Sequence, residues 1–263
     1  MSIRVGVFGA AGRMGRTVCA AVAGDPDTEL VAAVDPFHEG LDIRAVTGVD
    51  VPGMVVGGGS DSMSSAQAEV VVDFTEAAAA RENLRWCASN GVHAVVGTTG
   101  LTEDDHAELR SIFTNSNCVV APNFAIGAVL MMRLAEIAAP FFESVEIIEL
   151  HHDQKRDAPS GTAVLTADRI AAASSDWSPD PTTTEVVSGA RGGKAAAGIS
   201  IHSVRLRGLV AHQEVLFGTT GQSLSIRHDS YDRSSFMPGV LLAVKRVAHH
   251  PGVTIGLDAL LDL

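Results

Sequence analysis

Short hydrophobic runs alternate with longer amphipathic or alanine-rich stretches through the first half of the chain. The runs end at Gly, Asp or Thr, a pattern that predicts buried β-strands joined by helices. The predicted strands are 3–9, 30–34, 69–74, 92–96 and 118–121, and the predicted helices are 14–23, 77–89, a segment after 102, and 126–139. Such alternation is typical of a parallel sheet with right-handed crossovers. Residues 36–65 are irregular and rich in Gly and Ser, and they support no assignment.

The pattern changes in the second half, after a predicted strand at 145–151 and a helix at 160–173. Four further segments separated by Gly-containing turns predict the strands of an open sheet. These segments are 184–188, 199–206, 211–217 and 222–228. An amphipathic helix at 236–249 is expected to return to the first domain. Residues 174–194 hold three prolines and a glycine-rich run, which fits either a mobile lid or a plain connector.

Composition and charge narrow the function classes. Hydrophobic residues make up 46% of the chain and aromatics only 5%, so the core is built mainly from aliphatic side chains, as in many α/β proteins. The formal net charge of −12, without a long basic run, argues against a nucleic-acid partner. A small anionic substrate stays compatible with it, because a few cations in a cleft can dominate locally.

The cysteines and the N-terminal segment indicate the compartment. Cys19, Cys87 and Cys118 form no CxxC pair and are expected to be reduced core thiols. The N-terminus enters a strand pattern directly, without a charged leader, and no hydrophobic run reaches membrane-spanning length. We therefore expect a soluble cytoplasmic protein with no membrane partner.

A glycine-rich turn follows the first predicted strand. Gly9, Gly12 and Gly15 stand in GAAGRMG, where missing side chains let the backbone approach a pyrophosphate at a helix N-terminus. The spacing GxxGxxG is a weak signal alone, but the following strand ends on an acid, Asp35, which suits the ribose hydroxyls of a dinucleotide. Asp35 would repel a 2′-phosphate, whereas Arg13 could pair with one. We therefore predict use of both NADH and NADPH with a bias towards NADH.

These features together predict an α/β fold with two domains. An N-terminal Rossmann-like dinucleotide-binding domain comprises residues 1–125 plus 234–263, and a second α+β domain, built on an open mixed sheet, comprises residues 126–233. The second domain is expected to bind substrate, carry the catalytic groups and form the oligomer. Two turns at the expected carboxyl edge of the first sheet, 97–100 and 121–124, are either plain loops or nicotinamide contacts.

The segment ELHHDQKRDAPSGTA, residues 149–163, concentrates the candidate chemistry. His151 suits proton transfer near neutral pH, and Lys155 can pair with a substrate carboxylate or stabilise developing charge. His152 is adjacent to His151 at a strand end, so the two should point to opposite sides rather than chelate one ion. No metal site is predicted.

A helix N-terminus lies in the same segment. Pro159 disfavours helix before it, and Ser160 stands at an N-cap position. The first helical amides, at Gly161 and Thr162, then form a site for a carboxylate, although an ordinary cap would have the same Ser. An acid, a cation and a carboxylate cradle beside a hydride donor suit reduction of an anionic C=N or conjugated C=C–C=N substrate.

The chain resembles dihydrodipicolinate reductases over essentially its whole length. The motifs that carry this resemblance are GAAGRMG, VVDFT at 71–75, VVGTTG at 95–100, APNFAIG at 121–127, the 149–163 segment, HSVRLRGLVAHQEVLFG at 202–218 and RHDSYDRSSF at 227–236. HHxxKxDAPSGTA is the most specific of them. The resemblance implies reduction of 4-hydroxy-tetrahydrodipicolinate, or its dehydrated form, to tetrahydrodipicolinate in lysine and diaminopimelate biosynthesis, by a homotetramer built through the second sheet.

The resemblance also implies residue roles. His151 is expected to be the catalytic acid/base, Lys155 a second proton donor or carboxylate partner, and His152, Gly161, Thr162 and Arg233 substrate contacts. The cofactor contacts implied are Gly9, Ala10, Ala11, Gly12, Arg13 and Met14 at the pyrophosphate, Asp35 at the ribose, and Gly97, Thr98, Thr99, Ala121, Pro122, Asn123 and Phe124 at the nicotinamide end. Pro36 departs from family members that have an arginine there, which puts a strict NADPH preference in doubt.

Two other functions fit parts of the pattern. Another amino-acid dehydrogenase would share the glycine turn and the acid but should lack HHxxKxDAPSGTA. A non-catalytic NAD(P)H sensor would have no need of the His, Lys and helix-cap constellation. The sequence does not distinguish the hydroxylated from the dehydrated substrate.

Overall fold

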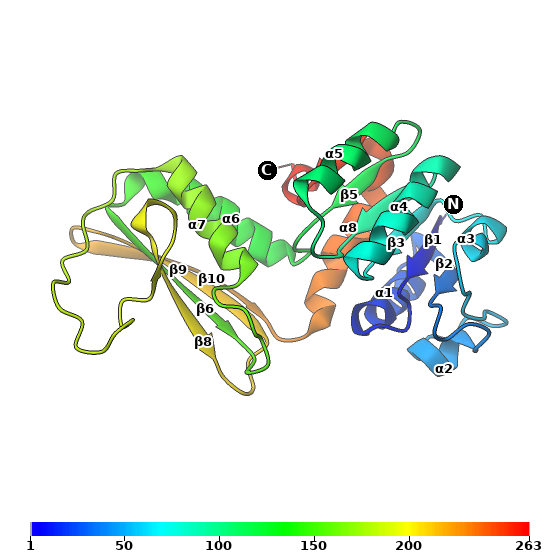
Figure 1. Ribbon diagram of the computed structural model, residues 1–263, viewed down its shortest axis with the longest axis horizontal. Helices are drawn as coiled ribbons and strands as arrows, with labels where there is room; N and C mark the ends of the chain where they lie inside the picture. Colours follow the sequence, from blue (N-terminus) through cyan, green and yellow to red (C-terminus); the bar gives the residue numbers. More distant parts are fainter. Residues whose placement is uncertain (1, 263) are drawn as a thin grey trace. The chain divides into compact units, whose positions relative to one another are not determined.

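The computed structural model describes residues 2–262, which form two compact units (Figure 1). The first unit contains residues 2–124 and 236–262, and the second contains residues 125–235. Relative to the predicted boundaries, Ala125, Ser234 and Ser235 fall in the second unit rather than the first. Each unit has its own sheet, so each is described separately below.

The first unit is built on a six-stranded parallel sheet with strand order β11-β5-β4-β3-β1-β2. Its strands are β1 Ile3–Phe8, β2 Thr28–Val34, β3 Val70–Asp73, β4 His93–Val96, β5 Cys118–Val120 and β11 Val253–Ile255. Its helices are α1 Arg13–Gly24, α2 Ile43–Thr47, α3 Asp61–Ser65, α4 Ala77–Asn90, α5 Glu103–Ile112 and α8 Met237–Arg246, with short 3-10 turns at Arg233–Phe236 (shared with the second unit), Val247–His249 and Asp258–Leu260. The predicted parallel α/β domain is confirmed.

The direction of winding reverses between β1 and β3, and this places the candidate site. The chain goes from β1 outward to β2, then returns past β1 to β3 and continues the other way through β4 and β5. Right-handed crossovers therefore put α1 on one face of the sheet, packed against α8, and α4 and α5 together on the other. A switch point of this kind opens a crevice at the carboxyl ends of the two central strands.

The sheet of the first unit is covered on both faces. Val5, Val7, Val72, Val95 and Val119 have no exposed surface, in strands that read as continuous valine-rich runs. The three cysteines are buried and free, as expected. Burial raises the pKa of Cys19 to about 12, so this thiol stays protonated at neutral pH.

Three elements of the first unit were not predicted from the sequence. The short helices α2 and α3 lie in the glycine- and serine-rich region, where five-residue helices leave little periodicity to detect. Strand β11 lies in the expected C-terminal tail and pairs with β5, through register partners Thr254 and Val119. Three residues are too few for an alternating pattern to be recognised.

The second unit is a five-stranded mixed sheet in the order β10-β9-β6-β8-β7. Its elements are α6 Ile126–Ala138, a 3-10 turn Ala139–Phe141, β6 Ser144–His151, α7 Gly161–Ala173, β7 Gly193–Lys194, a 3-10 turn Ala196–Gly198, β8 Ser200–Arg205, β9 Ala211–Thr219 and β10 Gln222–Ser230. Strand β6 pairs parallel with β8 and antiparallel with β9. Helices α6 and α7 pack on each other and on one face of this sheet. The open mixed sheet is therefore as predicted.

The predicted strand at 184–188 is wrong. These residues lie in a long irregular segment between α7 and β7, and Val186 and Val187 are 94% and 69% exposed. Its position in a series of segments separated by Gly-containing turns suggested a strand, but the segment has no partner strand to accept its backbone hydrogen bonds. The edge strand of the sheet is instead the two-residue β7.

Candidate active site

The glycine turn after β1 has the geometry of a phosphate-binding loop. Gly9 has a φ of +71°, and the Gly12 amide donates to its carbonyl at 3.0 Å. A Cβ on Gly15 would lie 2.0 Å from the Gly9 oxygen, so no other residue fits there without moving the turn. Gly12 and Arg13 are exposed at the start of α1, whereas Ala10 and Ala11 are buried beneath the turn. The turn therefore presents a helix N-terminus without obstructing side chains.

Asp35 follows β2 and is held beside this turn. Its Oδ2 accepts from the Ala11 amide at 3.3 Å, and its Oδ1 contacts the Phe37 amide at 3.1 Å and His38 Nδ1 at 2.8 Å. The carboxylate is 12% exposed, so an outer part of it stays open to a ligand. The structure thus brings the predicted ribose acid to the predicted pyrophosphate turn, and adds His38, which the sequence analysis did not single out.

The turn after β4 is organised by a buried carboxylate at the end of β3. Asp73 Oδ1 accepts from the hydroxyls of Thr98, at 2.8 Å, and Thr75, at 2.7 Å. Asn83 donates to Asp73 Oδ2 at 2.8 Å. The Thr98 hydroxyl is therefore directed into the protein, which leaves the backbone of this turn and exposed Thr99 to meet a ligand. A Cβ on Gly97 would lie 2.0 Å from the Phe74 ring, which explains the glycine.

The turn after β5 is similarly anchored from within. Ala121 and Phe124 are buried, and the Phe124 ring lies 5.7 Å from that of Phe74, centroid to centroid. Pro122 is exposed and Asn123 is half-buried. Of the four residues predicted at the nicotinamide end, Pro122 and Asn123 are therefore the ones that present side-chain surface.

A cluster of interacting charged and polar groups in the second unit surrounds Glu149 on β6. Glu149 is fully buried, and its carboxylate contacts His151 Nδ1 at 2.5 Å. Arg205, on the neighbouring β8, donates two hydrogen bonds to the same carboxylate, at 2.8 and 2.9 Å. The Ser160 amide donates to it at 3.2 Å. Four groups from three segments therefore meet at one buried carboxylate.

Lys155 and His152 lie in the turn that follows β6. Lys155 Nζ pairs with both oxygens of exposed Asp157, at 2.7 and 2.8 Å. That pairing lowers the pKa of the Asp157 carboxyl, so the pair is ionic at neutral pH. His152 is exposed, whereas His151 retains only 15% of its side-chain surface. The two histidines therefore have different environments, as predicted for neighbours at a strand end.

The helix start at Ser160 is capped as predicted. The Ser160 hydroxyl accepts from the Ala163 amide at 3.2 Å, and Gly161 and Thr162 form the first turn of α7. Gly161 is exposed, and a Cβ placed on it would have no atom within 4 Å. Neither backbone conformation nor packing requires glycine here, and the missing side chain leaves room for a ligand to approach the first turn of α7.

Arg233 is exposed in a 3-10 turn at the end of the second unit. The structure places it one turn before the chain enters the first unit, a position compatible with its predicted role.

Electrostatics distinguish the two ionisable groups on β6. Burial lowers the pKa of His151, and its hydrogen bond to Glu149 opposes this without cancelling it, so His151 is mostly neutral at pH 7 in the free protein. Burial alone would raise the pKa of Glu149. Hydrogen bonds from Arg205, Ser203 and His151 outweigh it, and the pKa lies below its usual value. The site thus combines a permanent buried anion with an imidazole that titrates.

Glu149, Arg205 and Asp73 were absent from the predicted site residues. Glu149 could have been found from its spacing, because residues two apart on a strand share a face, and Glu149 therefore lies beside His151. Arg205 required knowledge of the parallel register that pairs it with His151. Within residues 2–262 no cluster of three or more His, Cys, Asp or Glu side chains is arranged to hold a metal ion.

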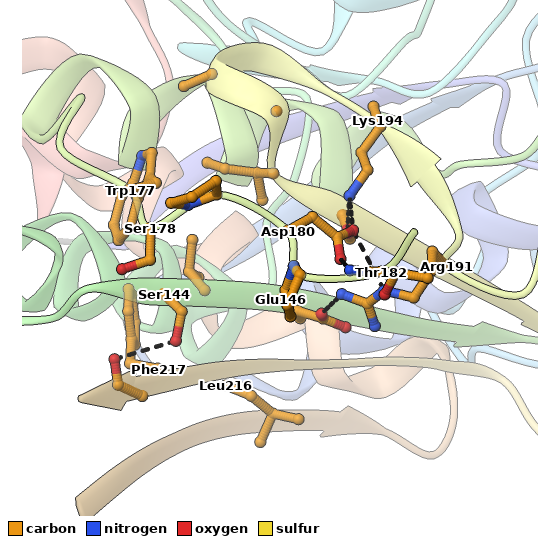
Figure 2. A pocket seen from close by; sticks show the side chains of 18 residues that line it. Ser144, Glu146, Trp177, Ser178, Asp180, Thr182, Arg191, Lys194, Leu216 and Phe217 are labelled. Atoms are coloured by element: carbon orange, nitrogen blue, oxygen red, sulfur yellow. Dashed lines mark hydrogen bonds and ion pairs between the residues drawn. The ribbon is translucent and has the colours of Figure 1, made fainter. Parts of the chain in front are cut away.

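A separate cavity of about 1010 Å³ lies in the second unit, between the 177–182 segment and strands β6 and β9. Figure 2 shows Glu146 and Arg191 in contact there, with Asp180 bonded to Lys194. Glu146 also contacts His202 Nε2 at 2.7 Å. None of the predicted site residues lines this cavity.

The doubly wound sheet with its glycine turn and ribose acid, together with an imidazole, a lysine and an open helix start, defines a dinucleotide-dependent oxidoreductase. Comparison with known proteins narrows the class. Residues 3–124 match the family model for the dihydrodipicolinate reductase N-terminus, and residues 127–261 match that for its C-terminus. The chain belongs to the dihydrodipicolinate reductase family.

Individual relatives agree along the whole chain. It is 52% identical to the 4-hydroxy-tetrahydrodipicolinate reductase of Nocardia farcinica, covering 100% of both chains, and 49% identical to that of Corynebacterium urealyticum, covering 99% of each. Among solved structures, it is 41% identical to a dipicolinate-bound dihydrodipicolinate reductase from Paenisporosarcina sp. TG-14, with a TM-score of 0.87 over 98% of this chain and 99% of that one. The expected fold class and family are therefore confirmed.

Proposed function

We propose that this chain is an enzyme that reduces 4-hydroxy-tetrahydrodipicolinate, or its dehydrated form, to tetrahydrodipicolinate with NADH or NADPH, in lysine and diaminopimelate biosynthesis. The observation that carries the proposal is the constellation on β6 and α7, where His151, Lys155 and the Gly161 turn follow one another in a member of this family. A sensor of dinucleotide levels would need none of these groups.

In this proposal His151 donates the proton to the substrate during reduction. Its Nδ1 is engaged by Glu149, so Nε2 is the nitrogen left to face a substrate. Lys155 holds a substrate carboxylate or acts as a second proton donor, and it exchanges its exposed partner Asp157 for the substrate. The two side chains together stabilise the charge that develops during reduction.

The start of α7 holds a carboxylate of the substrate. The Gly161 and Thr162 backbone and the positive end of the helix dipole favour an anion there. His152 and Arg233 are the further substrate contacts. A dicarboxylate suits this set, because cationic side chains and the helix start provide more than one place for negative charge.

The cofactor is held by the first unit. When bound, NADH or NADPH supplies the hydride for the reduction. The turn from Gly9 to Met14 holds the pyrophosphate, and Asp35 the adenosine ribose. The nicotinamide end is held by Gly97, Thr98, Thr99, Ala121, Pro122, Asn123 and Phe124.

The bias is towards NADH. Asp35 places a negative charge where a 2′-phosphate would lie, and Pro36 supplies no cation beside it. Arg13, exposed in the phosphate turn, offers partial compensation that lets NADPH serve as well. In steady-state kinetics, kcat/KM should be higher with NADH, and Arg13→Ala should lower kcat/KM for NADPH while leaving that for NADH within about twofold. A wild-type preference for NADPH would contradict the bias.

A homotetramer assembled through the sheet of the second unit, in the cytoplasm, completes the proposal. The sheet face opposite α6 and α7 supports it, since Leu216 there is 36% exposed in the single chain. No helix within residues 2–262 is long and apolar enough to span a membrane. Light scattering after size exclusion should give four times the 27.3 kDa mass of one chain.

The direct test follows NADH absorbance while the preceding synthase generates substrate from pyruvate and aspartate semialdehyde. Substrate-dependent oxidation, repeated with NADPH, is the expected result. NADH binding without oxidation of either cofactor would reject the proposal in favour of a sensor or another dehydrogenase.

A further inference from the structure

The fully buried Glu149 has more partners than a strand-to-strand ion pair needs. Its Oε2 contacts His151 Nδ1 and Arg205 Nη1, and its Oε1 accepts from Arg205 Nη2 and the Ser160 amide. A buried carboxylate is stable only when paired and hydrogen-bonded, and Arg205 meets that need with a two-pronged contact. The contacts to His151 and Ser160 connect it to the predicted chemistry.

We propose that Glu149, kept ionised by Arg205, is a positioning residue that fixes the tautomer and orientation of His151 so that proton transfer occurs at Nε2. The proposal deepens the proposed function and rests on it. Arg205 contributes through Glu149, and neither side chain needs to touch the substrate.

The tautomer follows from hydrogen-bond chemistry. An ionised carboxylate only accepts, so His151 Nδ1 must carry the hydrogen that points at Glu149. In the imidazolium form, Nε2 carries the second proton. When reduction occurs, the hydride and its electron pair form a new C–H bond and a π bond of the substrate breaks. The Nε2–H bond then breaks, and the proton bonds to the substrate atom that has received the displaced π electron pair. His151 is left neutral, still protonated at Nδ1, and regains the Nε2 proton from solvent.

The same carboxylate also fixes the carboxylate cradle relative to the proton donor. Glu149 Oε1 holds the amide of the N-cap residue Ser160, and Arg205 Nη2 donates to the Asp157 carbonyl at 2.7 Å. The turn between β6 and α7 is therefore held at both of its functional ends by one ion pair. His151 and Gly161 keep their separation because both depend on Glu149.

Glu149→Gln tests the proposal with little change in shape. The amide oxygen, in the place of Oε1, can still accept from Arg205 Nη2 and the Ser160 amide. The NH2 group, in the place of Oε2, then faces His151 Nδ1, and the hydrogen bond from Arg205 Nη1 is lost. Because that group donates, Nδ1 must become the acceptor, and the neutral ring is protonated at Nε2 instead. We expect kcat to fall by about 100-fold or more, as for loss of an orienting carboxylate beside a catalytic histidine. The dissociation constant for dipicolinate, measured by calorimetry, should stay within about threefold.

Glu146→Gln is the matched control. Glu146 lies three residues away on the other face of β6 and has its own histidine and arginine partners, His202 and Arg191. Its neutral variant should keep kcat within about twofold. An equal loss of kcat in the two variants would mean that any disturbance of β6 inactivates the protein, and would overturn the proposal.

The tautomer itself can be read without a variant of Glu149. In the whole protein labelled with ¹⁵N-histidine, the His151 ring at pH 8 should show a protonated Nδ1 and an unprotonated Nε2, with His151→Gln used for assignment. The opposite tautomer in the wild type overturns the proposal even if Glu149→Gln does not fold. So does a folded Glu149→Gln variant that keeps kcat within about threefold. If the wild type lacks reductase activity but has the expected tautomer, the proposed function fails and the geometric claim stands.

Discussion

Strand β6 carries two glutamate–histidine–arginine groups, one on each face, and they differ in burial. Glu149 has no exposed side-chain surface, whereas Glu146 retains 32%. Glu149 contacts its own strand's His151 and Arg205 of β8, while Glu146 contacts His202 of β8 and Arg191 of the long segment. The same residue types therefore form a buried candidate catalytic group around Glu149 on one face of β6. On the other face, around Glu146, they form partly exposed ion pairs that hold the long segment containing Arg191.

The difference shows that residue types alone do not define a site. Burial makes the Glu149 charge costly unless every partner is kept, and it lowers the pKa of His151. On the open face, water can replace any lost partner of Glu146, so the ion pairs there contribute little. Three substitutions, each with a counterpart, and one pH dependence of stability test this account.

The largest effect is expected at the two histidines. His151→Gln should lower kcat by about 10²- to 10⁴-fold, the range expected for loss of a general acid, because the glutamine side chain cannot transfer the proton that the imidazole carries. His202→Gln should leave kcat within about twofold. The synthase-coupled assay of NADH oxidation measures both, and equal rates for His151→Gln and the wild type would refute the proton-transfer role.

Substitution of the two arginines should have different effects on the free energy of unfolding. Arg205→Leu leaves a fully buried carboxylate without its cation and should reduce the free energy of unfolding by about 3–5 kcal/mol. Arg191→Leu breaks half-exposed ion pairs and should cost about 1 kcal/mol or less. Urea denaturation followed by circular dichroism gives both values. If Arg191→Leu reduced the free energy of unfolding as much as Arg205→Leu, the claimed difference in burial between the two faces of β6 would have no effect on stability, and the comparison would be wrong.

The start of α7 should respond in binding rather than in stability. Gly161→Ala places a methyl group in open space, so the melting temperature should stay the same or rise slightly. Dipicolinate should bind about tenfold more weakly, since a charged hydrogen bond to the first turn is obstructed. Gly24→Ala, at the last residue of α1 and equally free of neighbours, is the control. Unchanged dipicolinate affinity in Gly161→Ala would show that the first turn of α7 does not bind a carboxylate of the ligand.

The smallest effect is a pH dependence of stability. Because the pKa of His151 is lower in the folded than in the unfolded chain, the unfolded chain binds more protons as pH falls below about 6.5. Stability should therefore be complete above pH 6.5 and decrease by about 1 kcal/mol or less down to the folded pKa. His151→Gln should make this decrease smaller, and the part that remains comes from groups such as His93 and His228, whose pKa values burial also lowers. Denaturation at pH 7.5 and 5.5 can measure the difference. A decrease of equal size in the variant would contradict the assigned shift.

Much of this organisation could be predicted from local patterns. Valine-rich runs and the glycine turn gave the parallel sheet, and Pro159 with Ser160 gave the start of α7. The strand predicted at 184–188 is wrong because local sequence and flanking turns cannot reveal whether a partner strand exists. Arg205 was missed for the same reason, since its proximity to Glu149 depends on the pairing of β6 with β8 across more than fifty residues. Pairing is a property of the folded chain rather than of any one segment.

A crystal structure of the protein with NADH and dipicolinate tests the central claim most directly. The account predicts a dipicolinate carboxylate at Gly161 and Thr162, Lys155 released from Asp157, and His151 with Nε2 towards the ligand ring and Nδ1 on Glu149. Dipicolinate bound instead among Glu146, Trp177 and Arg191, with Lys155 still on Asp157, would contradict it.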